Sequence, residues 1–131
     1  MLELIASAQQ SILFANFCFA AGEQFDRFCI ALAARARVGV KVYMLADSYG
    51  SAHVSAEQLQ ALADAGVEWV WYRPLNLRNL FFYNHHLHKK LLIIDSLVGF
   101  TGGIGVADFW VGPSPRYPKM WRDTHFLING P

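Results

Sequence analysis

The stretch from Asn84 to Ser96, NHHLHKKLLIIDS, places three histidines and two lysines directly before an apolar run that ends in an aspartate. Alternate side chains of a strand share a face, so His88 and Lys90 should point the same way. A neutral imidazole is a competent nucleophile near neutral pH, and an ammonium beside it would attract a phosphate and lower the proton affinity of the histidine. The pair therefore indicates covalent chemistry on an anionic ester, although basic residues at the exposed start of a strand would give the same pattern.

The three histidines also raise the possibility of a zinc site, because imidazole is a common zinc ligand. Against this, the adjacent residues His85 and His86 would point to opposite faces of an extended chain. Neither a cysteine nor a carboxylate stands at ligand spacing from His88, so we expect no metal and no other cofactor. The Gly-rich segment 102–105 is not a dinucleotide fingerprint either, since Asp108 occupies the place of the last glycine in G-x-G-x-x-G.

Composition predicts one globular domain over residues 1–131, because an apolar content of 54% can fill a core. The 11 basic and 10 acidic side chains give a net charge of +1, which does not favour bulk attraction to nucleic acid. No apolar stretch approaches the roughly 18 residues of a membrane span, and the start MLELIASAQQ has no basic region of a signal peptide. We expect a cytoplasmic or membrane-associated protein in which Cys18 and Cys29 are small buried hydrophobes.

Strand patterns alternate with helix patterns along the chain. Apolar periodicity predicts helices from Leu2 and over 25–37, and a capping-box pattern of Ser55 and Gln58 begins a third helix that Gly66 closes. Apolar, β-branched and aromatic runs predict strands over 11–20, 41–47, 67–72, 88–95, 97–102 and 121–129. This order predicts an α/β fold with a mixed, largely parallel sheet flanked by helices, ending in a hairpin with a type I turn at 95–96.

The string H-x-K-x-x-x-x-D from His88 to Asp95, followed by the Gly-rich turn 102–105, resembles the signature of the phospholipase D superfamily. The text HKKLLIIDSLVGFTGGIGVADFW, with WRDTHFLINGP after it, is similar to cardiolipin-synthase-like members, which read HRKIVVIDGRVAFTGGINIGDEY and later WRDTH. The resemblance extends more loosely over the whole chain, including VKVYMLADSYGSA. It covers a phospholipase D-like half-domain with a single motif.

The resemblance implies phosphodiester chemistry in which His88 attacks phosphorus and Lys90 balances charge on the phosphoryl oxygens, with no metal. It gives Asp123 the role of holding the nucleophilic imidazole in its tautomer. The other members of the implied site are Asp95, with an indirect orienting role at the turn, and Gly102 and Gly103, whose backbone would approach and bind the anion.

The chain also departs from the family pattern. Gly105 stands where the family usually has an asparagine whose amide helps to grip the phosphate, so one side-chain donor is missing from the substrate-binding set. Family members protonate the leaving alkoxide with a second histidine, from a second copy of the motif, and this chain holds one copy. We therefore expect one half of a two-motif enzyme, with pairing of two copies about a two-fold axis as the alternative.

The apolar run Leu80, Phe81, Phe82 and Tyr83 favours a lipid substrate, because it would hold acyl chains or touch the edge of a bilayer. Nucleases of the superfamily would instead need a basic groove, which the net charge does not indicate, so a nucleic acid partner is not expected. We expect a phosphatidyltransferase or phosphodiesterase that acts on glycerophospholipids through a phosphohistidine. The alternatives are a nuclease-type phosphodiesterase active as a homodimer and a catalytically silent domain that binds phosphates or a partner.

Overall fold

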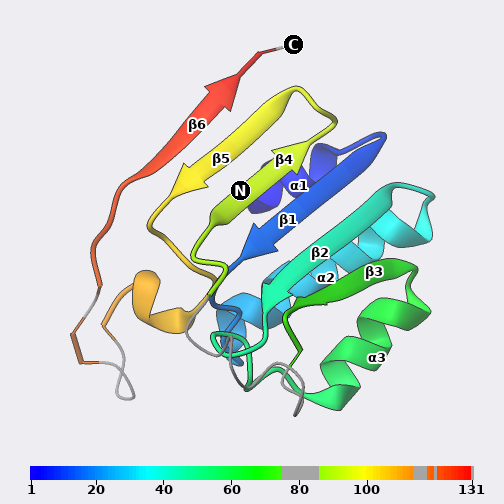
Figure 1. The fold of residues 1–131 in the computed structure, drawn as a ribbon. Helices are drawn as coiled ribbons and strands as arrows, with labels where there is room; N and C mark the ends of the chain where they lie inside the picture. Colours follow the sequence, from blue (N-terminus) through cyan, green and yellow to red (C-terminus); the bar gives the residue numbers. More distant parts are fainter. Residues whose placement is uncertain (75–85, 114–117, 120, 131) are drawn as a thin grey trace.

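The computed structural model describes residues 1–74, 86–113, 118–119 and 121–130. In this part of the chain a six-stranded sheet runs in the order β3-β2-β1-β4-β5-β6, with α1 and α2 behind the sheet in the view of Figure 1 and α3 beside β3. The bounds of the elements are α1 (Leu2–Ser7), β1 (Ser11–Asn16), α2 (Glu23–Arg37), β2 (Lys41–Asp47), α3 (Ala56–Asp64), β3 (Val67–Tyr72), β4 (Lys90–Ile94), β5 (Val98–Gly102) and β6 (His125–Asn129).

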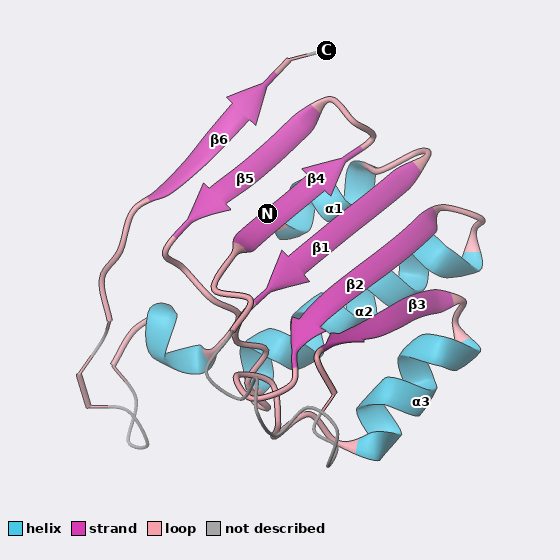
Figure 2. Ribbon diagram, in the orientation of Figure 1, coloured by secondary structure: helices cyan, strands magenta, loops and turns pink. Residues whose placement is uncertain are grey.

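The first half of the fold is parallel, with β1, β2 and β3 side by side and α2 and α3 as the connections (Figure 2). Both connections step in the same direction along the sheet, and right-handed crossovers of that kind place both helices on one face. The predicted capping box begins α3, since the Ser55 hydroxyl accepts from the Gln58 N–H at 3.1 Å and the Gln58 side chain accepts from the Ser55 N–H at 3.0 Å. This start signal is thus confirmed at the level of individual hydrogen bonds.

The second half of the fold is antiparallel, because β4 runs against β1 and is followed by β5 and β6. Along β4 the residues Lys90, Leu92 and Ile94 are buried, and the two between them are less so. That alternation is the period of two that a strand imposes. The expected α/β fold is confirmed, with a larger antiparallel share than a largely parallel sheet implies.

Three strands are shorter by three or four residues than the sequence predicts, and β5 is shorter by one. β1 stops at Asn16, whose side chain accepts from the Cys18 N–H at 3.3 Å and so turns the chain out of the sheet. β4 begins at Lys90 and β6 at His125, so His88 and the segment 121–124 precede their strands. In each case the residues predicted as strand extend past the residues that pair with a neighbouring strand.

The β4–β5 turn differs from the predicted type I turn. Asp95 and Ser96 have φ of 52° and 57°, and positive φ at both central residues is the mark of a type I′ turn. The mirror-image turn fits the right-handed twist of the two strands, whereas type I would splay them apart.

The core lies between the sheet and the helices and is rich in aromatic rings. The Phe14 and Phe19 rings meet edge to face at 5.1 Å, and Phe25 lies 5.6 Å from Phe19. Of the helices in the described part of the chain, none has the length and apolar character needed to cross a bilayer.

Candidate active site

The candidate residues other than Asp95 lie at one end of the sheet, where β1, β2, β3 and β5 end and β4 and β6 begin. Asn16 at the end of β1 is paired with Lys90 at the start of β4, and Gly102 at the end of β5 is paired with His125 at the start of β6. The carboxyl ends of the parallel strands β2 and β3 lie at the same edge (Figure 1). Ligands of open α/β sheets usually bind at this edge.

The structure brings His88 and Lys90 to the same aromatic ring. The imidazole of His88 lies 4.9 Å from the Phe17 ring, and the Lys90 ammonium lies 5.6 Å from the same ring, between centroid and nitrogen. His88 is exposed, whereas Lys90 is 7% exposed. An imidazole open to solvent and an almost fully buried ammonium therefore contact the same aromatic ring.

The Lys90 ammonium carries its charge in a partly desolvated place. Burial lowers the pKa of Lys90, and the neighbouring Cys18 and Asp123 raise it, with a net decrease. Burial also raises the pKa of the Cys18 thiol, an effect that Lys90 opposes. Among the described residues no carboxylate forms an ion pair with this ammonium. An anion bound here would supply the missing counter-charge.

Asp123 packs against the Gly-rich turn. A Cβ on Gly103 would overlap the Asp123 carboxylate, and a Cβ on Gly102 would overlap the Thr124 carbonyl. The Gly103 N–H donates to the Thr124 carbonyl at 3.1 Å, so this amide is used within the fold. The two glycines are thus explained by the close approach of the end of β5 to the segment before β6.

The electrostatic influence of Asp123 reaches Lys90 and His125. Burial lowers the pKa of His125, Asp123 raises it, and the N-terminus and Lys90 lower it, with a net decrease. In the described part of the chain no hydrogen bond joins Asp123 to His88. The role of Asp123 in fixing the His88 tautomer therefore stays a prediction.

Gly105 lies close to the Lys90 neighbourhood. A Cβ at this position would be 3.2 Å from Trp110 Nε1 and 3.6 Å from Cys18 Cβ. A side chain at this position would therefore require Trp110 to move by a few tenths of an ångström.

Asp95 lies at the opposite end of β4 from Lys90, at the turn where the sequence places an indirect, orienting role. Its carboxylate accepts the N–H groups of Gln9, Gln10 and Ser11 at 2.8, 2.7 and 2.9 Å. A strand of this length separates it from Lys90 by about 17 Å at about 3.3 Å per residue, so it cannot touch a group bound at His88. Through these bonds it joins the end of β4 to the start of β1.

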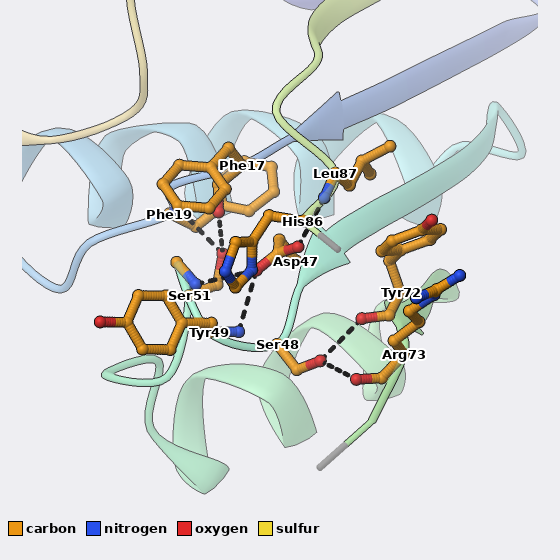
Figure 3. A network of polar contacts seen from close by, with 11 residues as sticks. Phe17, Phe19, Asp47, Ser48, Tyr49, Ser51, Tyr72, Arg73, His86 and Leu87 are labelled. Atoms are coloured by element: carbon orange, nitrogen blue, oxygen red, sulfur yellow. Dashed lines mark hydrogen bonds and ion pairs between the residues drawn. The ribbon is translucent and has the colours of Figure 1, made fainter. Parts of the chain in front are cut away.

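Sequence reasoning missed two residues of the site, Phe17 and Asp47. Asp47 ends β2, is 2% exposed, and accepts the Leu87 N–H at 2.7 Å just before His88 (Figure 3). The signal for Asp47 was its place at the carboxyl end of a parallel strand. His86, one of the three histidines considered for zinc, has its Nδ1 3.6 Å from Asp47 Oδ1.

Two of the predictions fall on residues outside the described part of the chain. These are the proposed membrane contact through Leu80, Phe81, Phe82 and Tyr83, and the contribution of His85 to a metal site.

Comparison with solved structures supports the fold described above. The solved structure of Nuc from Salmonella typhimurium, a phospholipase D family member, matches with a TM-score of 0.62 and 21% identity over 96% of this chain and 70% of that chain. At this identity the likeness shows the fold. NucT from Helicobacter pylori matches in the same way, with a TM-score of 0.63, 19% identity, and 96% and 72% of the two chains covered.

Sequence relatives are closer. A cardiolipin synthase of Alkalihalophilus pseudofirmus is 39% identical over 100 residues, which is 76% of this chain and 20% of the relative. Cardiolipin synthase 1 of Bacillus anthracis is 33% identical over 131 residues, which is 99% of this chain and 26% of the relative. The chain therefore spans about a fifth to a quarter of the length of these relatives. The family model described as cardiolipin synthase, PLD-like domain, matches residues 1–108, and the chain belongs to this family of phospholipase D-like domains.

Proposed function

We propose that His88 and Lys90 form one half of a phosphatidyltransferase site that acts on glycerophospholipids, as in the cardiolipin synthases that the chain resembles. The observation that carries the proposal is the meeting of an exposed imidazole and a 7% exposed ammonium on the Phe17 ring. The position of this pair at the carboxyl edge of the parallel strands supports it. The relatives' name supplies the substrate class.

In the proposed first step a nitrogen of His88 attacks the phosphorus of a phosphatidyl donor. The bond from phosphorus to the headgroup oxygen breaks, and the headgroup alkoxide takes a proton from a general acid and leaves as an alcohol. Lys90 stabilises the negative charge that develops on the phosphoryl oxygens. In the second step an alcohol attacks the phosphorus of the phosphohistidine and loses its proton to the conjugate base of that general acid. The bond from phosphorus to His88 breaks, which releases the phosphatidyl product and free His88.

The general acid comes from outside the single motif of this chain. We propose the histidine of a second motif, in the same polypeptide or in a second copy of this chain related by a two-fold axis. Asp123 is the proposed partner that orients His88. Since phospholipids reside in bilayers, the protein would work at a membrane surface, with residues 80–83 as the proposed contact.

The test is conversion of phosphatidylglycerol vesicles to cardiolipin and glycerol by the polypeptide that contains this chain, followed by mass spectrometry. The variants His88→Ala and Lys90→Met should each lower turnover by at least about 100-fold, since each removes a group that acts on the reacting phosphate. His53→Ala is the matched control, because His53 is an exposed histidine outside the motif 88–95. Quenching in base should trap a phosphatidyl adduct on His88.

A nuclease of the same superfamily is the second candidate, supported by the fold that this chain shares with Nuc over 70% of that chain. Cleavage of single-stranded nucleic acid without lipid turnover would replace the first proposal by this one. If His88→Ala kept full turnover of lipid, the proposal would be wrong about His88 as the nucleophile.

A further inference from the structure

His88 is exposed and stands outside any strand, yet its backbone is fixed on both sides. The N–H of Leu87 donates to Asp47 Oδ2 at 2.7 Å, and the carbonyl of Lys89 accepts from the Phe17 N–H at 3.1 Å. Because the backbone is held on both sides of His88, the direction of its Cα–Cβ bond is fixed. What holds the segment in place is thus part of what aims the imidazole.

The Asp47 carboxylate uses both of its oxygens. While Oδ2 accepts from Leu87, Oδ1 accepts the N–H groups of Tyr49 and Gly50, each at 3.0 Å, and lies 3.6 Å from His86 Nδ1 (Figure 3). The residue is 2% exposed, so these donors do not compete with bulk water. A buried carboxylate with a donor on each edge is a rigid link between the loop 47–51 and the segment 86–89.

The same loop also fixes Phe17, whose ring both site residues contact. Ser51 is fully buried, donates its hydroxyl to the Phe17 carbonyl at 3.2 Å and accepts the Phe19 N–H at 3.1 Å. Gly50 packs directly on the Phe17 carbonyl, where a Cβ would overlap it. The loop therefore positions the Phe17 ring from one side and the His88 backbone from the other.

We propose that Asp47 is a positioning residue of the site, which aims the His88 imidazole by fixing the Leu87 amide, with Ser51 as the second support through Phe17. This inference rests on the function proposed above for its kinetic consequence, but the geometry itself is independent of the substrate. An asparagine at 47 has the same shape and only one acceptor edge. Its NH2 group must then face either the Leu87 N–H or the N–H groups of Tyr49 and Gly50, and one side of the link opens.

The experiment compares Asp47→Asn with Asp108→Asn in the polypeptide that contains this chain. Asp108 is the matched control, because its carboxylate also accepts two backbone N–H groups, those of Glu23 at 3.3 Å and Gln24 at 2.8 Å, at the start of α2. Both variants should lower the melting temperature. Asp47→Asn should in addition lower kcat by about 10- to 100-fold with KM changed less than about two-fold, since a small misplacement of a reacting group has effects of this size. Asp108→Asn should leave kcat unchanged.

A structural readout separates this inference from the proposed function. In spectra of protein labelled on histidine, the His88 ring resonances should shift in Asp47→Asn and in Ser51→Ala and stay in place in Asp108→Asn, whether or not lipid is turned over. If the wild-type protein had no lipid activity and the two variants still showed these shifts, the proposed function alone would be overturned. Unshifted His88 resonances in both variants, or an unchanged kcat in a destabilised Asp47→Asn, would overturn the positioning role. Ser51→Ala keeps the test valid if Asp47→Asn fails to fold, because it removes one hydroxyl and no charge.

Discussion

Replacing Asp95 by asparagine should destabilise the fold without touching the site. The Asp95 carboxylate accepts three backbone N–H groups from Gln9, Gln10 and Ser11, at 2.7 to 2.9 Å. An asparagine keeps one acceptor oxygen, which can retain the two bonds of Oδ1, and turns an NH2 group toward the N–H of Gln9. Hydrogen bonds to charged groups contribute more than neutral ones, so we expect the free energy of unfolding to fall by about 2 kcal/mol at pH 7. For a chain of this size that lowers the melting temperature by about 6 °C.

The effect should depend on pH in a defined direction. Burial raises the pKa of Asp95, but the N–H groups of Ser11, Gln9 and Gln10 and the charge of Arg35 outweigh it, and the net pKa lies below the ordinary value. The unfolded chain binds this proton near the ordinary pKa of about 3.9 and the folded chain only at lower pH. The stabilisation by Asp95 is therefore complete above about pH 5 and is lost as the pH falls through the folded pKa.

Thermal unfolding of the two proteins between pH 3 and pH 7 measures this difference. Asp64→Asn is the control, because among the described residues the exposed Asp64 accepts only from the Gln60 side chain, at 2.7 Å, and its change should stay within about 0.5 kcal/mol. A melting temperature for Asp95→Asn within one degree of wild type at neutral pH would refute the reasoning. So would a difference that persists undiminished at the acid end.

Two further substitutions test the turn and the close approach of β5 to the segment before β6. Ser96→Gly should raise the free energy of unfolding by about 0.5 to 1 kcal/mol in a denaturant titration, because Ser96 has a φ of 57° and a side chain disfavours that region; a lower midpoint would contradict the I′ geometry. Gly103→Ala should cost about 1 to 3 kcal/mol and reduce turnover, because its methyl group would displace the Asp123 carboxylate. Gly99→Ala, within β5 and with open space around its Cβ, should do neither, and equal effects of the two would show that the contact with Asp123 is unimportant.

Local features of the fold were predictable from sequence because neighbours along the chain decide them. The Ser55 and Gln58 pair begins α3, and Gly66, with a φ of 92°, follows α3 as predicted. The handedness of the β4–β5 turn was not predictable from Asp95 and Ser96 alone. Either residue can occupy a type I turn, and the twist of the two strands selects the mirror-image form.

The site was predictable only as far as one motif reaches. His88 and Lys90 stand two residues apart, so a local argument could place them together. Asp47 binds a residue 40 positions away along the chain, and the Phe17 ring contacts one 71 positions away. Such contacts depend on which strands become neighbours in the sheet, and the periodicity of a segment carries no information on that. A polar residue at the carboxyl end of a parallel strand was the available hint.

The spacing between the lysine and the aspartate of the motif follows from the length of β4 and its neighbour β1. Lys90 is paired with Asn16 at one end of β1, and Asp95 binds the backbone at the other end, so β4 is fixed to β1 at both ends. Leu92 and Ile94 are buried on the same face as Lys90, which requires an even step from the lysine to each. One residue fewer before Asp95 would move that carboxylate away from Ser11, and one residue more would reverse the face of Lys90 if the aspartate kept its place. The motif thus places the proposed reacting pair at one end of a strand and a carboxylate that fixes the strand register at the other, which explains how a residue about 17 Å from the proposed chemistry can belong to the same motif.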